Sequence, residues 1–499
     1  MQNRWIITDV ADNVAVALTA LDAGEKIGDH LLPGAIPAGH KFALRDISKG
    51  EPVIKLGHAI GVASGDIVQG EHVHNHNLAF AGQADRSIIG TDIRQPPRHN
   101  ACFDGYIRPD GRVGTRNSIA ILTSVNCSAT VAKRIASHFT PERMAAYPNV
   151  DGVVAFSHMS GCGMAKSGRG IDNLRRSIGG YVAHPNFAAV LLVGLGCEVN
   201  QIDPLLEGAG LVVSERLQTL GIQEAGGTMV AIETGIAQVE AMLPTANDCR
   251  RQPVSAEYLT IGLQCGASDG YSALTANPAL GAAADLLVGA GGKVILSETP
   301  EIYGAEDLLL RRAASPQTAQ ALIDRLSWWE NYAAREGADL NNNPSPGNKM
   351  GGITTILEKS LGAVAKAGSS PLNAVIDYAA PITAPGLTFM DSPGYDPCSA
   401  TGQIAGGANL ILFTTGRGSA FGSGPIPTIK LASNALLAQT MADDIDLDCS
   451  PILDGTDLTA MGDAIFHLLI DVASGRQTAS ERLGIGENEW VPWVPGAMF

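Results

Sequence analysis

Residues 118–128 have the sequence SIAILTSVNCS, and this stretch decides the fold class. It is a continuous apolar run that ends in a polar turn, without alternation of apolar and polar positions. Two further runs of this kind follow, GVVAFSH at 152–158 and AAVLLVG at 188–194, and helix-like segments such as ATVAKRIASHF at 129–139 separate the runs. Unbroken apolar strands that alternate with helices are typical of a parallel sheet covered on both faces. We therefore predict an α/β fold with mostly parallel sheets.

The same alternation resumes near residue 258 with YLTIGLQC and continues to IPTIKLA at 426–432. The N-terminal part differs, because its short apolar runs are separated by turn residues at hairpin-like spacing, which predicts a small β-rich unit. The segment after it has no clear period and contains Pro96-Pro97, which indicates a linker. We predict a β-rich domain at 1–77, a linker at 78–103, and two α/β domains at 104–250 and 251–499.

The composition is that of a globular enzyme. The chain has 499 residues, of which 45% are hydrophobic and 17% charged, so it can bury large cores. Its net charge of −16 repels nucleic acid and anionic membranes, and we expect neither as a partner. The N-terminus lacks the apolar segment of a signal peptide, and no apolar run reaches the about 18 residues of a membrane span. Eight cysteines are then typical of a reducing compartment, so we expect a cytoplasmic protein.

Cysteines follow the ends of several apolar runs. They are Cys127, Cys162, Cys197 and Cys265. The carboxyl ends of parallel strands meet at one edge of a sheet, where ligands of α/β proteins bind. Cysteines of one sheet would therefore converge, and three or four thiolates could hold a single iron ion or an iron–sulfur cluster. The alternative is a set of small, buried side chains without a ligand, but their repetition at one topological position favours a metal site.

The segment EHVHNHN at 71–77 closes the N-terminal unit, and His72, His74 and His76 alternate in it. On a strand these positions share one face, so two or three imidazoles could bind a divalent metal. The alternative is the solvated end of an edge strand. We interpret the run as an arm that reaches a site on the larger body, with His40 and His58 as weaker candidates.

Polar, glycine-rich segments follow other predicted strands. They carry amides, hydroxyls, carboxylates and a few cations, which suits a small polyhydroxylated anion, although any one of them could be an ordinary loop. The candidate substrate-binding residues are Asn277, Asn348, Thr415, Arg417 and Lys430. The candidate catalytic residues are Lys349, His158, Ser268 and Asp269. Neither GxGxxG nor GxxxxGK[ST] occurs in its strand–helix context, which argues against nucleotide binding.

At these motifs the chain resembles the altronate and galactarate dehydratases over nearly its whole length. The resemblance rests on DGYIRPDGRVGTRN, GLGCE, CGASDGYSALTANP, SETPEIYGAE, NNNPSPGNKMGGITTILEKSLG and FTTGRGS. It implies a SAF-type N-terminal domain, matched at Gly39-His40-Lys41 and EHVHNHN, fused to a large dehydratase body. It also implies dehydration of a C6 aldonic or aldaric acid to a 2-keto-3-deoxy acid with ferrous iron. Mn2+ and Mg2+ are alternative metals.

The substrate stays open at this point. The histidine run is similar to altronate dehydratases, whereas the segment from Gly394 to Ser399, with Cys398, is nearer to galactarate dehydratases. Sulfolactate sulfo-lyases share the scaffold and expel sulfite in place of water. A sugar-acid-binding protein without activity would have similar loops, and a hydride-transferring oxidoreductase is disfavoured by the missing dinucleotide fingerprint.

Dehydration of a 2,3-dihydroxy acid requires a base at C2, stabilisation of a dianionic aci-carboxylate and an acid for the leaving hydroxyl. We expect iron on some of the four cysteines to polarise the leaving hydroxyl or the carboxylate. Arg417 and Lys430 would hold the substrate carboxylate. Lys349 is the first candidate for the base, with His158 or the histidine run behind it. We expect a small-molecule substrate and a homo-oligomer.

Overall fold

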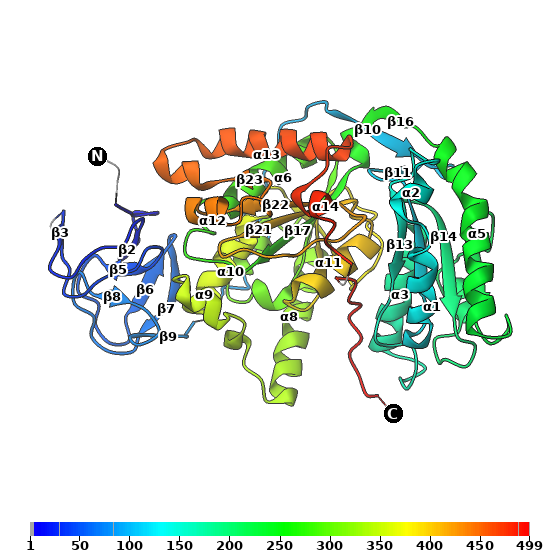
Figure 1. Cartoon of the computed structure of the whole chain (residues 1–499). Coiled ribbons are helices and arrows are strands. Elements are labelled where there is room, and N and C mark those ends of the chain that lie inside the picture. The colour runs from blue at the N-terminus through cyan, green and yellow to red at the C-terminus, as the bar shows by residue number, and fades with distance from the viewer. Residues whose placement is uncertain (1–3, 29, 83, 488, 499) are drawn as a thin grey trace.

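The computed structural model of the chain describes residues 4–28, 30–82, 84–487 and 489–498. It consists of a small β-rich unit and a body of two α/β domains, with the β-rich unit at one end and the second domain at the other (Figure 1). Both main sheets of the body are parallel throughout. The predicted fold class is therefore confirmed.

The N-terminal unit contains small antiparallel sheets. One has the order β1 (Trp5–Ile6), β2 (Val14–Ala17), β5 (Lys41–Ala43), β8 (His72–Val73). Another has the order β6 (Pro52–Lys55), β7 (His58–Ala63), β9 (Leu78–Ala79), and β3 (Lys26–Ile27) pairs with β4 (His30–Leu31). The strand β9 lies inside the segment predicted as a linker, so the β-rich unit extends to Ala79.

The second domain is a four-stranded parallel sheet. Its order is β13 (Gly152–Phe156), β12 (Ser118–Thr123), β14 (Phe187–Gly194), β15 (Leu217–Gly221). Helices α1 (Ala129–Ala136) and α5 (Thr228–Asp248) cover one face, and α3 (Arg169–Ala183) and α4 (Ile202–Gly208) cover the other. Ile119 and Ile121 pack toward α1 and α5, whereas Ala120 and Leu122 pack toward α3. Burial of both faces explains the unbroken apolar run in the sequence.

The third domain is a seven-stranded parallel sheet. Its order is β19 (Leu372–Ile376), β20 (Gly386–Met390), β18 (Lys293–Leu296), β17 (Thr260–Gly266), β21 (Leu410–Thr415), β22 (Thr428–Ala432), β23 (Leu447–Asp448). Helices α6 (Ala276–Gly289), α10 (Ile356–Ala365) and α13 (Leu458–Ala473) cover one face, and α11 (Asp396–Ala405) the other. Because β18 and β21 lie on opposite sides of β17, the strand order reverses between β17 and β21.

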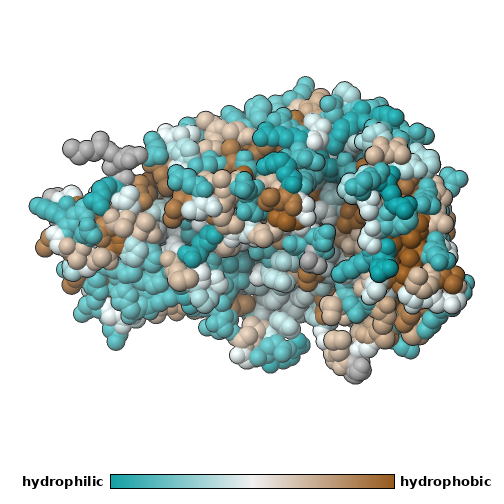
Figure 2. Space-filling model, viewed as in Figure 1, coloured by the Kyte–Doolittle hydropathy of each residue, from teal (hydrophilic) through white to brown (hydrophobic). Residues whose placement is uncertain are grey.

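Further helices are shorter or lie outside these layers. They are α2 (Pro141–Met144), α7 (Asp307–Leu310), α8 (Pro316–Glu336), α9 (Pro346–Met350), α12 (Ala435–Thr440) and α14 (Ala479–Leu483). None of the helices in the described ranges is long and apolar enough to cross a membrane. Hydrophilic residues cover most of the face seen in Figure 2, and apolar residues gather over the second domain at the right.

A small antiparallel sheet joins the two α/β domains, and the sequence did not predict it. It has the order β11 (Val113–Gly114), β10 (Cys102–Ile107), β16 (Arg251–Ser255). The strand β10 precedes the second domain and β16 follows it, and the two pair from Cys102 opposite Ser255 to Tyr106 opposite Arg251. The chain thus enters and leaves the second domain through neighbouring strands. Both strands contain polar residues, which obscure the apolar pattern by which strands are predicted from sequence.

A buried ion triad attaches the N-terminal unit to the third domain. Glu358 of α10 accepts from Lys41 Nζ at 2.9 Å through Oε2 and from Lys55 Nζ at 2.8 Å through Oε1. All three side chains are at most 2% exposed. Burial would raise the pKa of Glu358, but the two ammonium groups hold it well below its usual value. The carboxylate is therefore ionised at neutral pH and fixes β5 and β6 to the body.

Substitution Glu358→Gln removes this charge without changing the shape, and it leaves two buried ammonium groups without a counterion. We expect the free energy of unfolding to fall by about 3 kcal/mol. Denaturant unfolding measures this loss, and hydrogen exchange in β5 and β6 locates it. The exposed Glu207→Gln on α4 is the matched control and should unfold like the parent. Equal stability of the two variants would show that the triad does not hold the unit.

Candidate active site

A cavity of about 900 Å³ lies between the N-terminal unit and the carboxyl edge of the seven-stranded sheet. It is lined by Asp269 and Tyr271 after β17, by Gly416 and Arg417 after β21, and by Leu18, Thr19 and Ala38 of the N-terminal unit, among others. The strand order reverses between these two strands, and ligands of open α/β sheets bind at such a switch point. This position makes the cavity the candidate active site.

Glycines let the N-terminal unit approach the body closely here. A Cβ atom on Gly270 would lie 2.0 Å from the carbonyl oxygen of Gly39, and one on Gly352 would lie 2.3 Å from the same oxygen. Tyr271 donates its hydroxyl to the carbonyl groups of Ala17 and Leu18. The cavity is therefore closed on one side by backbone of another domain.

Asp269 is the buried carboxylate of the cavity lining. Its Oδ1 accepts from Ser272 Oγ at 2.9 Å and Ser433 Oγ at 2.8 Å, while Oδ2 accepts from Asn434 Nδ2 at 2.9 Å. Burial raises the pKa of Asp269, against the effect of these hydrogen bonds. Ala267, two residues before Asp269, has a φ of 53°, which is strained for a side chain with a Cβ. Strain before a buried, hydrogen-bonded carboxylate is typical of a functional turn.

Arg417 supplies the positive charge. It is exposed at the cavity, and within the described ranges its guanidinium makes no hydrogen bond or ion pair. Asn434 Nδ2 also donates to the carbonyl of Gly416 at 2.7 Å, which holds the turn that carries Arg417. A guanidinium that no protein carboxylate occupies can bind a ligand carboxylate through two hydrogen bonds.

Histidines of the N-terminal unit reach the same region. His40 Nε2 lies 3.1 Å from the carbonyl oxygen of Met350, and His74 Nε2 lies 2.9 Å from that of Lys349. His40 Nδ1 lies 3.0 Å from His72 Nε2, and the three ring centroids are 5.0 to 5.4 Å apart. The predicted reach of this segment toward the body is present, but the predicted strand is not, since β8 ends at Val73 and a turn follows.

These three imidazoles suit a divalent metal by chemistry. Burial lowers the pKa of His72 to about 3 and that of His74 to about 4, and it lowers that of His40, so all are neutral at pH 7. Neutral imidazole is the metal-binding form, and His74, which donates one N–H to a backbone carbonyl, keeps its other nitrogen as a ligand. Both nitrogens of His40 are engaged, so binding of an ion by His40 requires its contact with His72 to break. Their ligand atoms do not all lie within 4.8 Å, so a common ion would draw the rings together.

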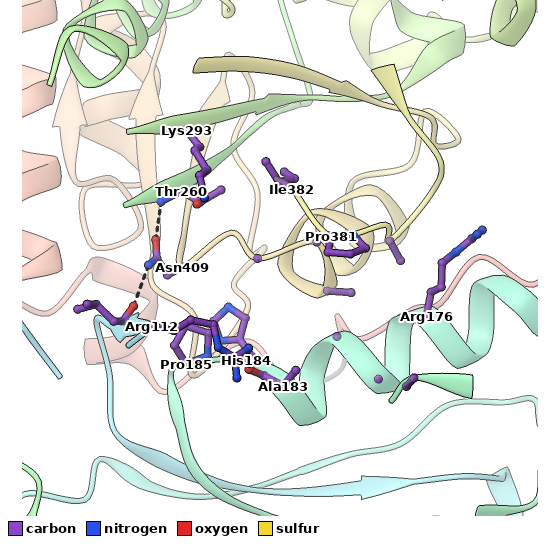
Figure 3. A pocket seen from close by; sticks show the side chains of 18 of the residues that line it. Arg112, Arg176, Ala183, His184, Pro185, Thr260, Lys293, Pro381, Ile382 and Asn409 are labelled. Atoms are coloured by element: carbon purple, nitrogen blue, oxygen red, sulfur yellow. Dashed lines mark hydrogen bonds between the residues drawn. The ribbon is translucent and has the colours of Figure 1, made fainter. Parts of the chain in front are cut away.

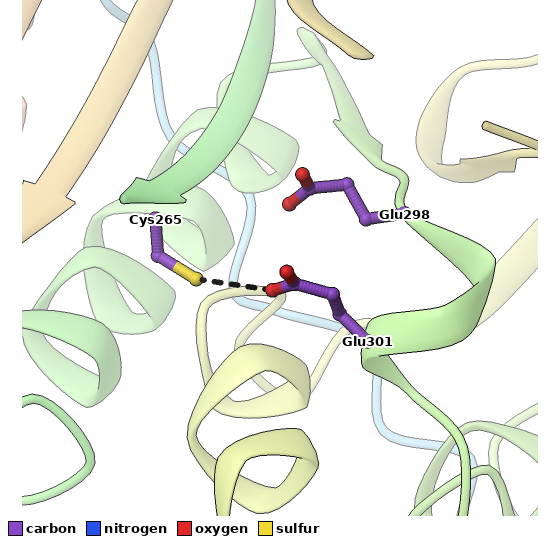
Figure 4. A group of neighbouring side chains, drawn as sticks. All are labelled: Cys265, Glu298 and Glu301. Atoms are coloured by element: carbon purple, nitrogen blue, oxygen red, sulfur yellow. Dashed lines mark hydrogen bonds between the residues drawn. The ribbon is translucent and has the colours of Figure 1, made fainter. Parts of the chain in front are cut away.

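A tighter group of ligand atoms lies at the ends of β17 and β18 (Figure 4). Cys265, Glu298 and Glu301 point toward one another there, with ligand atoms within 4.8 Å. Lys366 Nζ lies 2.9 Å from Cys265 Sγ, and Lys359 Nζ lies 2.7 Å from Glu301. Lys359 compensates Glu301, whereas burial raises the pKa of Glu298 well above its usual value and that of the Cys265 thiol to about 11. Burial thus favours the protonated forms of two of the three groups.

The other predicted metal ligands lie elsewhere. Cys127, Cys162 and Cys197 are exposed at the carboxyl edge of the second domain, whereas Cys265 is buried in the third. The four cysteines therefore do not share one edge. His158 is also in the second domain, where Nε2 bonds to the carbonyl of Thr123 and Nδ1 accepts from the backbone of Ser160. Both of its ring nitrogens are occupied, and it is not part of the cavity.

Several predicted substrate residues lie beneath the cavity. Asn277 is buried and bonds to Gly362 and to Thr414. Lys430 is buried, donates to the carbonyl of Ser419 and pairs with Asp444 at 3.6 Å. The hydroxyl of Thr415 accepts from the backbone of Gly418. These side chains hold the loops around the site.

Three more predicted residues lie next to the lining. Asn348 donates Nδ2 to the carbonyl of Ser268 at 2.8 Å, which ties the turn after β17 to α9. Lys349 precedes the cavity-lining Met350 and is half-buried. Within the described ranges its ammonium group makes no hydrogen bond or ion pair. The structure thus brings Lys349, Asp269, Arg417, His72 and His74 to one region.

Sequence reasoning undervalued or missed several residues of this region. His40 was a weaker candidate, although it lies directly before a strand that pairs with the strand of His72. Asn434 was missed, although it follows IPTIKLAS and caps α12 by accepting from the backbone of Leu437. A polar N-cap after an apolar strand was the available signal.

A second cavity, of about 930 Å³, lies between the second and third domains (Figure 3). Its lining includes Thr260 and Lys293, at the starts of β17 and β18, and Arg176 and His184 of the second domain. This is the amino-terminal edge of the sheet, opposite the edge at which α/β proteins bind substrates. The position argues against catalysis there.

Comparison with known families covers almost the whole chain. Residues 3–81 match the altronate/galactarate dehydratase SAF domain, so the predicted identity of the N-terminal domain is confirmed. Residues 105–247 match the D-galactarate dehydratase/altronate hydrolase second domain, and residues 256–498 match the D-galactarate/altronate dehydratase C-terminal domain.

Individual proteins are also similar to this chain over most of its length. The altronate dehydratase of Escherichia coli is 37% identical over 96% of this chain and 97% of its own length. The galactarate dehydratase (L-threo-forming) of the same organism is 36% identical over 95% of this chain and 94% of its own length. The (2R)-sulfolactate sulfo-lyase subunit beta of Chromohalobacter salexigens is 31% identical over 77% of this chain and 95% of its own length.

Because the pKa values of His72 and His74 are lowered in the folded chain, we expect the stability of the fold to depend on pH. In the unfolded chain they bind protons near pH 6.5, whereas in the folded chain His72 and His74 do so only near pH 3 and 4. The unfolded state therefore binds more protons below pH 6.5, and acidification toward pH 4 destabilises the fold. We expect the melting temperature to fall over this range less steeply in His72→Gln than in the parent. The exposed His467→Gln should leave the slope unchanged, and equal slopes in all three proteins would contradict the assignment.

Proposed function

The chain belongs to the D-galactarate/altronate dehydratase family, and from this premise we propose that it removes water from a C6 sugar acid to give a 2-keto-3-deoxy acid. The observation that carries the proposal is the guanidinium of Arg417, which is unpaired among the described residues, in a cavity at the switch point of the third domain. A substrate carboxylate is the ligand that such a group selects. Polar side chains and backbone groups around it suit the hydroxyls of a sugar acid.

The proposed reaction begins with binding of the carboxylate. Arg417 holds it in a bidentate pair and lowers the energy of the second negative charge that develops when C2 loses its proton. Asn434 and Asp269 keep the turn of Arg417 in place, because Asn434 bonds both to Asp269 and to Gly416. The carboxylate plane is thereby oriented before the proton is removed.

Lys349 is the proposed base for the C2 proton. It lies on the α9 segment whose carbonyl groups the histidines contact, next to residues that line the cavity. Ser268 and Asp269, on the turn after β17, contribute to positioning, and Asp269 is the second candidate for proton transfer. The raised pKa of Asp269 brings its carboxyl group nearer to the pH at which it can exchange a proton.

We propose that His40, His72 and His74 hold ferrous iron, with Mn2+ or Mg2+ as alternatives. Three protein ligands leave coordination positions open, as in catalytic metal sites. When bound, the ion supplies a Lewis acid for the departing C3 hydroxyl or the carboxylate. His40 and His74 contact the carbonyl groups of Met350 and Lys349, so an ion held by these histidines would lie beside the segment of the proposed base.

Altronate is the first candidate substrate, because the histidine run that distinguishes altronate dehydratases contributes to this region. Galactarate is the second, and the segment around Cys398 favours it. Expulsion of sulfite from sulfolactate uses the same carbanion chemistry and is the rival reaction. A binding protein without activity would hold these acids unchanged.

A substrate panel tests the proposal. The protein is incubated anaerobically with altronate, galactarate, other C6 sugar acids and sulfolactate, with and without ferrous iron. We expect formation of a 2-keto-3-deoxy acid from one sugar acid, at a rate that iron increases and a chelator abolishes. Sulfite release from sulfolactate alone would replace the proposal by a sulfo-lyase, and binding without turnover on any acid would refute catalysis.

Two substitutions test these roles. Arg417→Gln removes a charged hydrogen-bond pair worth about 2 kcal/mol that holds the carboxylate and stabilises its developing charge, so we expect kcat/KM to fall about 30-fold. Lys349→Met removes the proposed base, and we expect kcat to fall by a factor of about 10² to 10⁴. The exposed Arg335→Gln on α8 is the matched control for charge. A Lys349→Met enzyme with the kcat of the parent would exclude this lysine as the base.

A further inference from the structure

Three cysteine-bearing loops meet at the carboxyl edge of the second domain. The sheet order β13–β12–β14 places the loops after these strands side by side, on strands that lie about 4.8 Å apart. Thr123 of β12 pairs with Val193 of β14. Cys127 lies four residues after Thr123, and Cys197 lies four residues after Val193. Leu122 pairs with Phe156, and Cys162 comes from the loop after that strand. The cysteines therefore leave the sheet at nearly the same height.

Hydrogen bonds close these loops into a ring through residues beside the cysteines. Asn126, before Cys127, donates its backbone N–H to the carbonyl of Ser160 in the Cys162 loop at 2.9 Å. The carbonyl of Gly161, before Cys162, accepts from the backbone of Asn200 in the Cys197 loop at 3.0 Å. Glu198, after Cys197, accepts from Ser124 Oγ in the Cys127 loop at 2.6 Å. Each loop is thus held to the next.

The backbone of this ring is tightly packed, but the thiols are not. Gly161 has a φ of 101°, and a Cβ there would lie 2.5 Å from the carbonyl oxygen of Ser124. Cys127, Cys162 and Cys197 are all exposed, and none of their thiols makes a hydrogen bond in the described parts of the chain. Three free thiols on a rigid frame are not packing residues of a core. They are available to a ligand.

We propose that Cys127, Cys162 and Cys197 hold a [4Fe–4S] cluster, with its fourth iron open to a small oxygen or nitrogen ligand. Thiolates are the usual protein ligands of such clusters. His158, the histidine of these loops, cannot serve as a fourth protein ligand, because both of its ring nitrogens bond to backbone groups. On binding, each thiol loses its proton and replaces one ligand of a preformed cluster, and no iron changes oxidation state.

The three sulfurs lie too far apart for one ion in the arrangement described. Around one ion with metal–sulfur bonds of about 2.3 Å, two sulfurs lie at most about 4.6 Å apart. The three cysteines do not form a group with ligand atoms within 4.8 Å of one another. A single zinc or iron ion would therefore have to pull the ring of loops inward, whereas a cluster spans a wider set of sulfurs.

The proposed cluster is separate from the cavity of the third domain, and the inference does not rest on the proposed function. Cys265, whose buried thiol contacts Lys366, takes no part in it. Its test needs no turnover, so a failure here and a failure of the proposed dehydration can be told apart.

The full chain is incubated anaerobically with a synthetic [4Fe–4S] thiolate complex and then desalted. We measure iron, acid-labile sulfide and absorption near 400 nm for the parent and for Cys127→Ser, Cys162→Ser and Cys197→Ser. The parent should retain about four irons and four sulfides per chain, as one such cluster contains. Each variant should retain less than a quarter of this amount. Cys102 is exposed on β10 and distant in sequence from these loops, and Cys102→Ser should behave like the parent.

Circular dichroism and thermal unfolding of the cluster-free variants check that the exposed substitutions leave the fold intact. Equal retention of iron and sulfide by the parent and the triple Cys→Ser variant would overturn the proposal. So would binding of zinc or iron without sulfide at these cysteines, or a disulfide between two of them that persists after reduction of the protein under native conditions.

Discussion

The ionised carboxylate of Glu358 between Lys41 and Lys55 is the constraint on which the candidate active site depends. Lys41 also donates to the carbonyl of Gly352, and Thr354 donates to Glu358 from both its backbone and its hydroxyl. The triad thus fixes the β-rich domain and the segment after α9 to each other. His40 directly precedes Lys41, so its contact with the Met350 carbonyl follows from this anchoring. The buried triad therefore helps to hold the wall of the cavity on that side, together with the Tyr271 hydroxyl.

The sequence predicted the sheets because the forces that form them are local. The run at 118–125 is apolar on both faces since α1 and α5 cover one face and α3 the other, and a pattern of this kind needs no knowledge of the partner strand. The loops of Asp269 and Arg417 were predicted for the same reason, because strand ends in a parallel sheet share an edge. The antiparallel β10–β16 pair was not predicted, as its residues are polar and its partners are far apart in the chain.

The apolar pattern of a strand does not show which other strands belong to the same sheet. Cys265 ends an apolar run as Cys127 does, but it belongs to the other sheet and contacts Lys366 from α10. His158 has the residue type of a proton carrier, yet its burial against Trp490 and its two backbone bonds make it a structural side chain. Asn434 and His40 gain their importance from neighbours that only the tertiary structure supplies.

The pairing of β10 with β16 has a consequence for how the chain folds. Phe103 opposite Val254 joins residues separated by the entire second domain, and Phe103 belongs to the core of the third. Bringing such distant residues together as a random coil costs chain entropy that grows with the length of the intervening loop. Once the four-stranded sheet has formed, the two ends of the second domain lie close together. The loop that must then be closed to pair β10 with β16 is short. We therefore expect the second domain to fold before β10 pairs with β16.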